Sequence, residues 1–175
     1  MKPTRLFRSA LPLVFLLLLS ALAAAEKAKE KEGPRATPFP SSARPDQECL
    51  TWSGDPCTTQ AVQWRTGLAA KKGVVQYRKK AEPEKARQEA AAIGSTMNDP
   101  DITNDPSVHW YTAVLKGLVP GTAYAYRVGT GQEDGWSAWS EFSTAPATAV
   151  PFSFVYLGDA QAGFEAWGNL LHQAY

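Results

Sequence analysis

The sequence predicts a mainly β protein, an antiparallel β-sandwich followed by the first β-α unit of an α/β domain. Two observations predict the sandwich. Short stretches rich in β-branched and aromatic residues recur between residues 46 and 148, and clusters of Gly, Pro, Asp and Ser separate them. A third observation predicts the α/β unit, because a nearly continuous apolar run after residue 149 precedes a segment with helical spacing.

Residues 1–25 have the pattern of a signal peptide. Lys2, Arg5 and Arg8 precede an apolar run over residues 11–22, and three alanines at 23–25 provide the small residues of a cleavage site. A membrane span needs about 20 apolar residues, and this run is shorter. We therefore expect a secreted or periplasmic protein with no stable membrane span after the signal is cleaved.

Residues 26–45 are predicted to form a disordered linker, because they mix charges of both signs with prolines and contain little apolar surface to bury. The formal net charge of the chain is +1. This near-neutral charge lacks the excess of Lys and Arg that is typical of nucleic-acid-binding proteins, so we expect no nucleic-acid partner.

The region 46–148 is the size of one small β-sandwich, which needs about 100 residues. Alanine-rich Lys80–Gly94, with Pro83 suited to a first turn, predicts a short helix or loop within it. Asn98–Pro106 carries oxygen-rich side chains that suit calcium, although its two Asn-Asp-Pro triplets more simply make two turns. Strands are expected at Glu48–Trp52, Ala61–Thr66, Gly73–Arg78, Val108–Leu115, Ala123–Gly129 and Trp139–Ser143.

The sequence contains two cysteines, Cys49 and Cys57, which lie eight positions apart. In an oxidising compartment this spacing predicts a disulfide that closes a hairpin, with a stabilisation of about 2 to 3 kcal/mol. A metal role is disfavoured, because two thiols without a second ligand pair make a poor zinc site.

Two motifs in this region resemble known fibronectin type III sequences. Leu118–Val128 resembles the signature in which a tyrosine, here Tyr124, bonds back to nearby backbone, and Trp64 matches the buried tryptophan of such domains. Trp136–Ser140 resembles the Trp-Ser-x-Trp-Ser box of cytokine receptors, for which Arg127 is the candidate cation-π partner. The alternative is two aromatics that pack on a strand edge, and the four cysteines of such receptors are not matched by the two found here.

Residues 149–175 begin a second pattern after a hinge at residues 145–148. Phe152–Leu157 is predicted to be a strand buried on both faces, and apolar residues recur at helical spacing from near Gly163. Ligands of open α/β sheets bind beyond the carboxyl ends of strands. Asp159, which follows the strand after Gly158, is therefore placed to bind a metal or a phosphate.

From about residue 38 to Tyr175 the chain resembles the N-terminal part of a purple acid phosphatase of the bacterial branch. The resemblance rests on the order of Val62–Thr66, Val74–Tyr77, His109–Leu115, Leu118–Val128, Trp136–Ser137, Phe142–Thr144 and Phe154–Gln161. It implies that residues 46–148 are the fibronectin type III-like N-terminal domain of that family. Residues 149–175 would be the start of a calcineurin-like metallophosphoesterase domain, truncated at Tyr175.

The resemblance implies an exported hydrolase of phosphate monoesters with a two-metal centre of iron paired with iron, zinc or manganese. Asp159 matches the family's first metal ligand. Gln161 lies where related enzymes use histidine, and it binds the metal, orients Asp159 or does neither. In the family, the other ligand motifs come later than the position of Tyr175: a second Gly-Asp, a Gly-Asn-His and two histidine motifs. We therefore expect this chain to hold an incomplete metal centre, with no catalytic residue, and to have no activity alone. The alternative is a secreted, non-catalytic fibronectin-like binding module.

Overall fold

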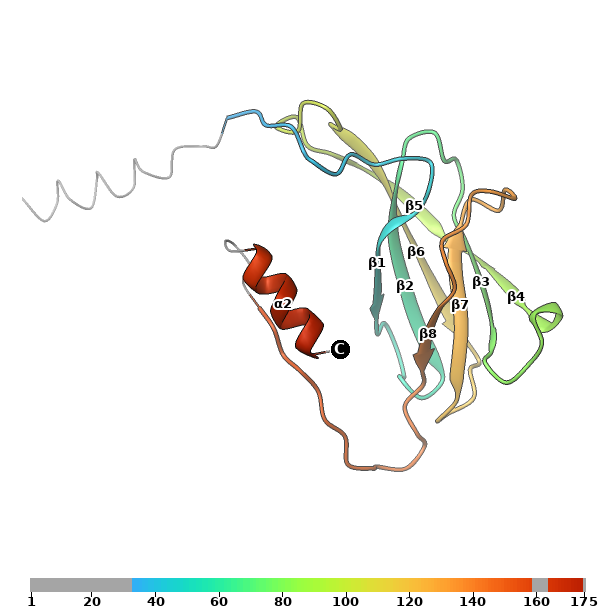
Figure 1. Cartoon of the computed structure of the whole chain (residues 1–175). Coiled ribbons are helices and arrows are strands. Elements are labelled where there is room, and N and C mark those ends of the chain that lie inside the picture. The colour runs from blue at the N-terminus through green and yellow to red at the C-terminus, as the bar shows by residue number, and fades with distance from the viewer. Residues whose placement is uncertain (1–32, 159–163, 175) are drawn as a thin grey trace, which may run out of the picture.

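The computed structural model describes residues 33–158 and 164–174, and within them the chain folds into a two-layered β-sandwich (Figure 1). All strand pairs between named elements are antiparallel. One sheet has the order β1-β2-β6-β5 and the other β4-β3-β7-β8. The strands are β1 Asp46–Thr51, β2 Thr59–Gly67, β3 Val74–Lys79, β4 Gln88–Ala91, β5 Ile93–Asn98, β6 Ser107–Lys116, β7 Ala123–Gly129 and β8 Ser140–Ser143.

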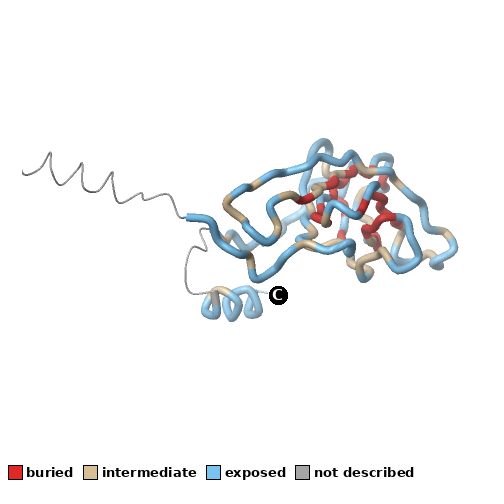
Figure 2. Tube along the Cα trace, turned by 90° about the horizontal axis from the view of Figure 1, so that it is seen from above, coloured by how far each residue is buried: buried red, intermediate tan, exposed pale blue. Residues whose placement is uncertain are grey.

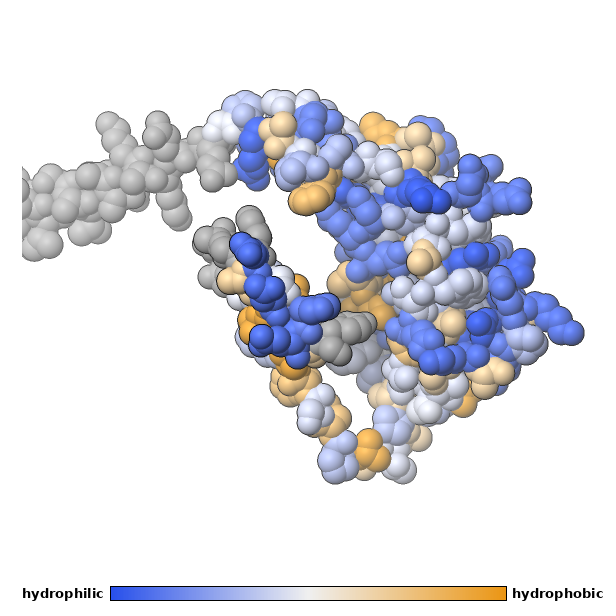
Figure 3. Space-filling view, viewed as in Figure 1, coloured by the Kyte–Doolittle hydropathy of each residue, from blue (hydrophilic) through white to orange (hydrophobic). Residues whose placement is uncertain are grey.

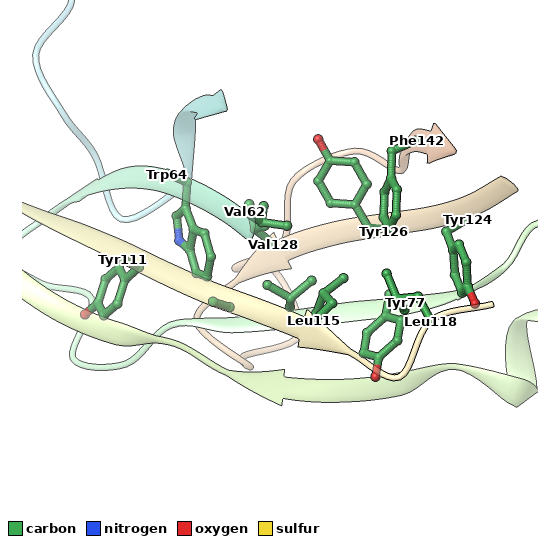
Figure 4. Packing of buried hydrophobic residues seen from close by; sticks show 12 residues of the cluster. Val62, Trp64, Tyr77, Tyr111, Leu115, Leu118, Tyr124, Tyr126, Val128 and Phe142 are labelled. Carbon is green, nitrogen blue, oxygen red and sulfur yellow. The ribbon is translucent and has the colours of Figure 1, made fainter. Parts of the chain in front are cut away.

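The core lies between the two sheets, where alternate residues of the long strands point inward. Trp64 of β2 is fully buried and stacks on Tyr111 of β6 with ring centroids 5.7 Å apart. Tyr124 of β7 stacks on Phe142 of β8 at 5.3 Å. Figure 4 shows these side chains directed into the space between the sheets, and Figure 2 shows that the buried residues gather there. The predicted mainly β fold, an antiparallel β-sandwich, is thus confirmed.

The prediction of a short helix or loop over Lys80–Gly94 holds for residues 80–87, which form turns and a 3-10 helix at Glu84–Ala86, and is wrong for residues 88–94, most of which belong to β4 and β5. β4 pairs with β3 in the register Val75 to Ala90, and β5 pairs with β6. The chain passes from one sheet to the other at Ala92, whose N–H donates to the carbonyl of Gly73 at 2.9 Å. Open backbone edges of β3 and β6 accept this segment, so sheet pairing overrides its helix propensity.

The described part of the predicted linker is held against the sandwich instead of being a free chain. We call residues 35–45 the N-terminal strap. Its Arg35 N–H donates to the carbonyl of Asp101, and the Asn104 side chain both donates to and accepts from the backbone of Thr37 at 2.9 Å. The composition is that of a linker, but specific polar partners on a distant loop provide the missing stabilisation.

The C-terminal segment agrees with one prediction and contradicts another. A helix, α2, spans Phe164–Ala174 as expected. Residues 151–158 form no regular structure, so the predicted strand at Phe152–Leu157 is wrong, and Phe152 and Tyr156 are 82% and 85% exposed. A strand requires a neighbour to accept its backbone hydrogen bonds, and no described residue pairs with this run. Figure 3 shows apolar residues exposed along the segment that leads to α2. α2 is too short and too polar to cross a membrane, and the described residues include no longer helix that would do so.

Candidate functional site

The predicted metal ligands Asp159 and Gln161 lie outside the described residues. Gly158, which precedes them, is exposed. Within residues 33–158 and 164–174, no group of three or more His, Cys, Asp or Glu side chains is arranged to hold a metal ion.

Trp64 and Tyr124 have structural roles. The Val119 N–H donates to the Tyr124 hydroxyl at 2.9 Å, which is the geometry of a tyrosine corner. Gly121 has a φ of 59°, and this left-handed conformation lets the chain turn between Pro120 and β7. The indole of Trp64 is fully buried, and its Nε1 has no hydrogen-bond partner. Both residues organise the core and provide no reactive group.

The predicted disulfide between Cys49 and Cys57 is not formed in the structure, where both residues are free thiols. Cys49 lies on β1 opposite Gln63, whereas Cys57 lies in the following turn and not on a strand. The Cys57 Sγ donates to the carbonyl of Pro146 at 3.4 Å. Desolvation, followed by the Asp55 carboxylate, raises the pKa of the Cys57 thiol, and this lowers its reactive thiolate fraction.

The Asn98–Pro106 loop uses its oxygens to clamp the N-terminal strap. Asp105 accepts hydrogen bonds from the Ser41 N–H at 2.7 Å and the Ser41 hydroxyl at 2.8 Å. Arg65, buried beneath the strap, donates to both carboxylate oxygens of Asp46 at 2.8 and 2.6 Å. The hydrogen bond with Asp46 raises the pKa of the Arg65 guanidinium. Because protein donors occupy these carboxylates, the loop favours the two-turn interpretation over a calcium site.

Two tryptophans and two arginines form a row of cation-π contacts on the outer face of the β4-β3-β7-β8 sheet. We call this row, made of Trp136, Trp139, Arg127 and Arg78, the Trp-Arg ladder. The Arg127 guanidinium lies 4.9 Å from the ring centroid of Trp136 and 4.8 Å from that of Trp139. Arg78 of β3 lies 5.5 Å from the Trp139 ring. The Arg127 Nε–H also donates to Oε1 of Gln76 at 2.8 Å. Arg127 thus contacts both tryptophans, as predicted. Arg78 was not predicted as a partner, because it lies far from the tryptophans in sequence and only the pairing of β3 with β7 brings it close to them.

Two cavities meet at the loop between β2 and β3, and sequence reasoning missed both. The larger, of about 800 Å³, lies between this loop, the strap and the loop after β7, and its lining includes Arg44 and Asp134. The smaller, of about 310 Å³, is lined by Ala92, Gly94, Ser95, Thr96, His109 and Tyr111. Lys71 and Lys72 line both cavities. The Lys-Lys pair before Gly73 was the one signal in the sequence that pointed to this place.

The fold defines an antiparallel β-sandwich domain with a tyrosine corner at Tyr124. Residues 45–144 match the model of the purple acid phosphatase N-terminal domain. The chain belongs to this family.

The solved structures similar to this chain include a fibronectin type III domain and a redesigned β-sandwich. The chain is similar to a fibronectin type III domain of human contactin 1, with 18% identity, 68% of this chain and 90% of that chain covered, and a TM-score of 0.45. It is similar to a redesigned β-sandwich protein, with 17% identity, 60% of this chain and 97% of that chain covered, and a TM-score of 0.41. It is also similar to the sensor domain of an anti-sigma factor from Pseudobacteroides cellulosolvens, with 15% identity, 66% of this chain and 95% of that chain covered, and a TM-score of 0.39. The comparison with curated proteins gave no match.

Proposed function

We propose that this chain provides the N-terminal, non-catalytic portion of an exported metallophosphoesterase that hydrolyses phosphate monoesters at a two-metal centre. The observation that carries the proposal is the family match over residues 45–144. The Gly158-Asp159 pair, which follows in the sequence, supports it through its resemblance to the first metal-ligand motif of purple acid phosphatases. The metal ions would act as Lewis acids on the phosphoryl oxygens.

The role proposed for the sandwich is to hold the start of the catalytic domain. β8 is the last strand of the described residues, and Asp159 follows it in the sequence. The Ala145 N–H donates to the carbonyl of Pro56 at 3.0 Å, and the Gly121 N–H donates to the carbonyl of Ala145 at 3.0 Å. These bonds and the Trp-Arg ladder fix the point from which the next segment departs.

Export is the proposed route, supported by the basic and apolar pattern of residues 1–25. The expected compartment is the periplasm or the exterior. Mass spectrometry of the protein recovered from that compartment tests this, because cleavage after Ala25 gives a mature chain that begins at Glu26. A chain that retains Met1–Ala25 in the cytoplasm would contradict the proposal.

The coding sequence beyond the codon for Tyr175 tests the proposed activity. We expect an open frame that encodes a second Gly-Asp motif and a Gly-Asn-His motif, which would provide the remaining metal ligands. A stop codon with neither motif in frame nearby would contradict the enzyme proposal. That result would favour the alternative, a secreted binding module.

A further inference from the structure

We propose that the smaller cavity, beside His109, is a binding site for an oxyanion, either inorganic phosphate or the phosphate group of a small ester. Its lining contains two ammonium groups, an imidazole and two hydroxyls, from Lys71, Lys72, His109, Ser95 and Thr96. No Asp or Glu is among these lining residues. Hydrogen-bond donors with a net positive charge are the groups that bind an oxyanion.

The close packing of Gly73 against two aromatic rings fixes the position of the lysine pair that precedes it. A Cβ at Gly73 would lie 2.6 Å from the Tyr111 ring and 2.7 Å from Trp64, so only glycine lets the backbone pass this close to the two rings. Lys71 and Lys72 immediately precede this contact. The Lys71 ammonium donates to the carbonyl of Leu68 at 2.8 Å, within the loop between β2 and β3. Lys72 has no hydrogen-bond or ion-pair partner among the described residues.

His109 is oriented by contacts inside the fold. Its Nδ1 lies 2.8 Å from the carbonyl oxygen of Ala70, which also accepts a hydrogen bond from the Tyr111 hydroxyl at 2.8 Å. Nδ1 therefore carries the proton and donates a hydrogen bond to the Ala70 carbonyl. In the neutral ring the other nitrogen, Nε2, is a hydrogen-bond acceptor, so it suits the hydroxyl of a protonated phosphate, and it has no partner in the described part of the chain. Thr96 pairs with His109 in the β5–β6 register, so both residues belong to the same wall of the cavity.

The neighbouring larger cavity is less suited to an anion. Its lining includes the carboxylate of Asp134 as well as Arg44, and that carboxylate would repel an oxyanion. The smaller cavity has a volume of about 310 Å³, at the lower end of the range for small-ligand sites. We therefore assign it a ligand the size of phosphate or a small phosphate ester.

The two histidines of the chain provide the readout and its internal control. We would label histidine with ¹³C and titrate the whole chain with sodium phosphate, with phenyl phosphate and with sodium chloride at matched ionic strength. The resonances of His109 are expected to move and to saturate with the phosphates. His172, on α2 outside the cavity, is expected not to move. Tighter binding of phenyl phosphate would assign the site to an ester, and tighter binding of phosphate to the free anion.

The charge variant Lys71→Gln/Lys72→Gln is expected to weaken phosphate binding at least about tenfold, because two charge-assisted hydrogen bonds are lost. Both lysines are exposed, so the substitutions leave the core intact, and near-ultraviolet circular dichroism checks this. Lys85→Gln/Lys116→Gln removes the same charge elsewhere and should bind like the wild type. No saturable shift of His109, an equal response to chloride, or an equal loss in the control variant would overturn the proposal. It does not rest on the metal centre, so its failure would leave the proposed phosphatase role unaffected.

Discussion

Replacement of Arg127 by methionine tests whether the Trp-Arg ladder holds the outer face of the sandwich together. Methionine keeps a long apolar side chain but removes the guanidinium that lies between Trp136 and Trp139. Each cation-π contact at a half-buried site stabilises by about 0.5 to 1 kcal/mol. The substitution also leaves Oε1 of the buried Gln76 without the donor it has at 2.8 Å, which costs a further 1 kcal/mol or so.

We therefore expect Arg127→Met to lower the free energy of unfolding by about 2 to 3 kcal/mol. For a sandwich of this size that corresponds to a fall in Tm of about 10 °C or more. Urea unfolding followed by tryptophan fluorescence and thermal unfolding followed by circular dichroism measure the two quantities. Arg44→Met, which removes an exposed arginine with no side-chain partner among the described residues, is the matched control.

A double-mutant cycle separates the ladder from general packing. Arg127→Met and Trp136→Phe should be coupled by about 0.5 to 1 kcal/mol, because each removes the partner of the other. Trp139→Phe should cost more than Trp136→Phe, since Trp139 also contacts Arg78 at 5.5 Å. The reasoning is refuted if Arg127→Met unfolds within about 0.5 kcal/mol of the wild type, the level of an ordinary surface substitution.

Three further predictions follow from other contacts. Asp105→Ala removes both hydrogen bonds to Ser41, so it should lower the free energy of unfolding by about 2 kcal/mol and speed proteolysis within residues 35–45. The control variant Asp101→Ala should change neither quantity, and equal cleavage rates in the two variants would contradict this prediction. Desolvation raises the pKa of half-buried Glu48 above its ordinary value, so the folded state binds the proton more tightly than the unfolded state, and stability should fall as the pH rises through the folded pKa. Glu48→Gln should flatten that part of the urea-derived stability profile, and an unchanged slope would count against the burial argument. Limited proteolysis of the wild type should cut first within residues 147–158, where the chain is exposed and without regular structure, and an earlier cut inside a strand would argue for a different boundary.

The six strands expected from the sequence all exist, and their bounds differ from the expected ones by at most two residues. Alternation of apolar and polar residues with flanking turn residues was a sufficient signal, because each of these strands has one face in the core. Tyr124 and Trp64 followed from a local motif. Arg127 was also identified as the ladder partner, since the motif names the kind of contact that its tryptophans make.

The parts that were missed depend on contacts between residues far apart in the sequence. The alanine-rich segment before Ala92 becomes β4 because β3 presents an open edge, which no local propensity reveals. The N-terminal strap is ordered through Asp105 and Asn104, some 65 residues away, so its composition alone indicated a linker. Phe152–Leu157 has the composition of a buried strand and lacks a pairing partner among the described residues. The site at His109 requires the β2–β3 loop and β5 to converge, which the sequence does not show.

The rate of p-nitrophenyl phosphate hydrolysis by the pure 175-residue chain tests most directly the claim that this sandwich is the non-catalytic domain of a phosphatase. With and without added iron or zinc, we expect a rate equal to that of the protein-free blank, because the described residues hold no metal cluster and Asp159 is proposed to be only one ligand of a larger set. Metal-dependent turnover by this chain would contradict the account.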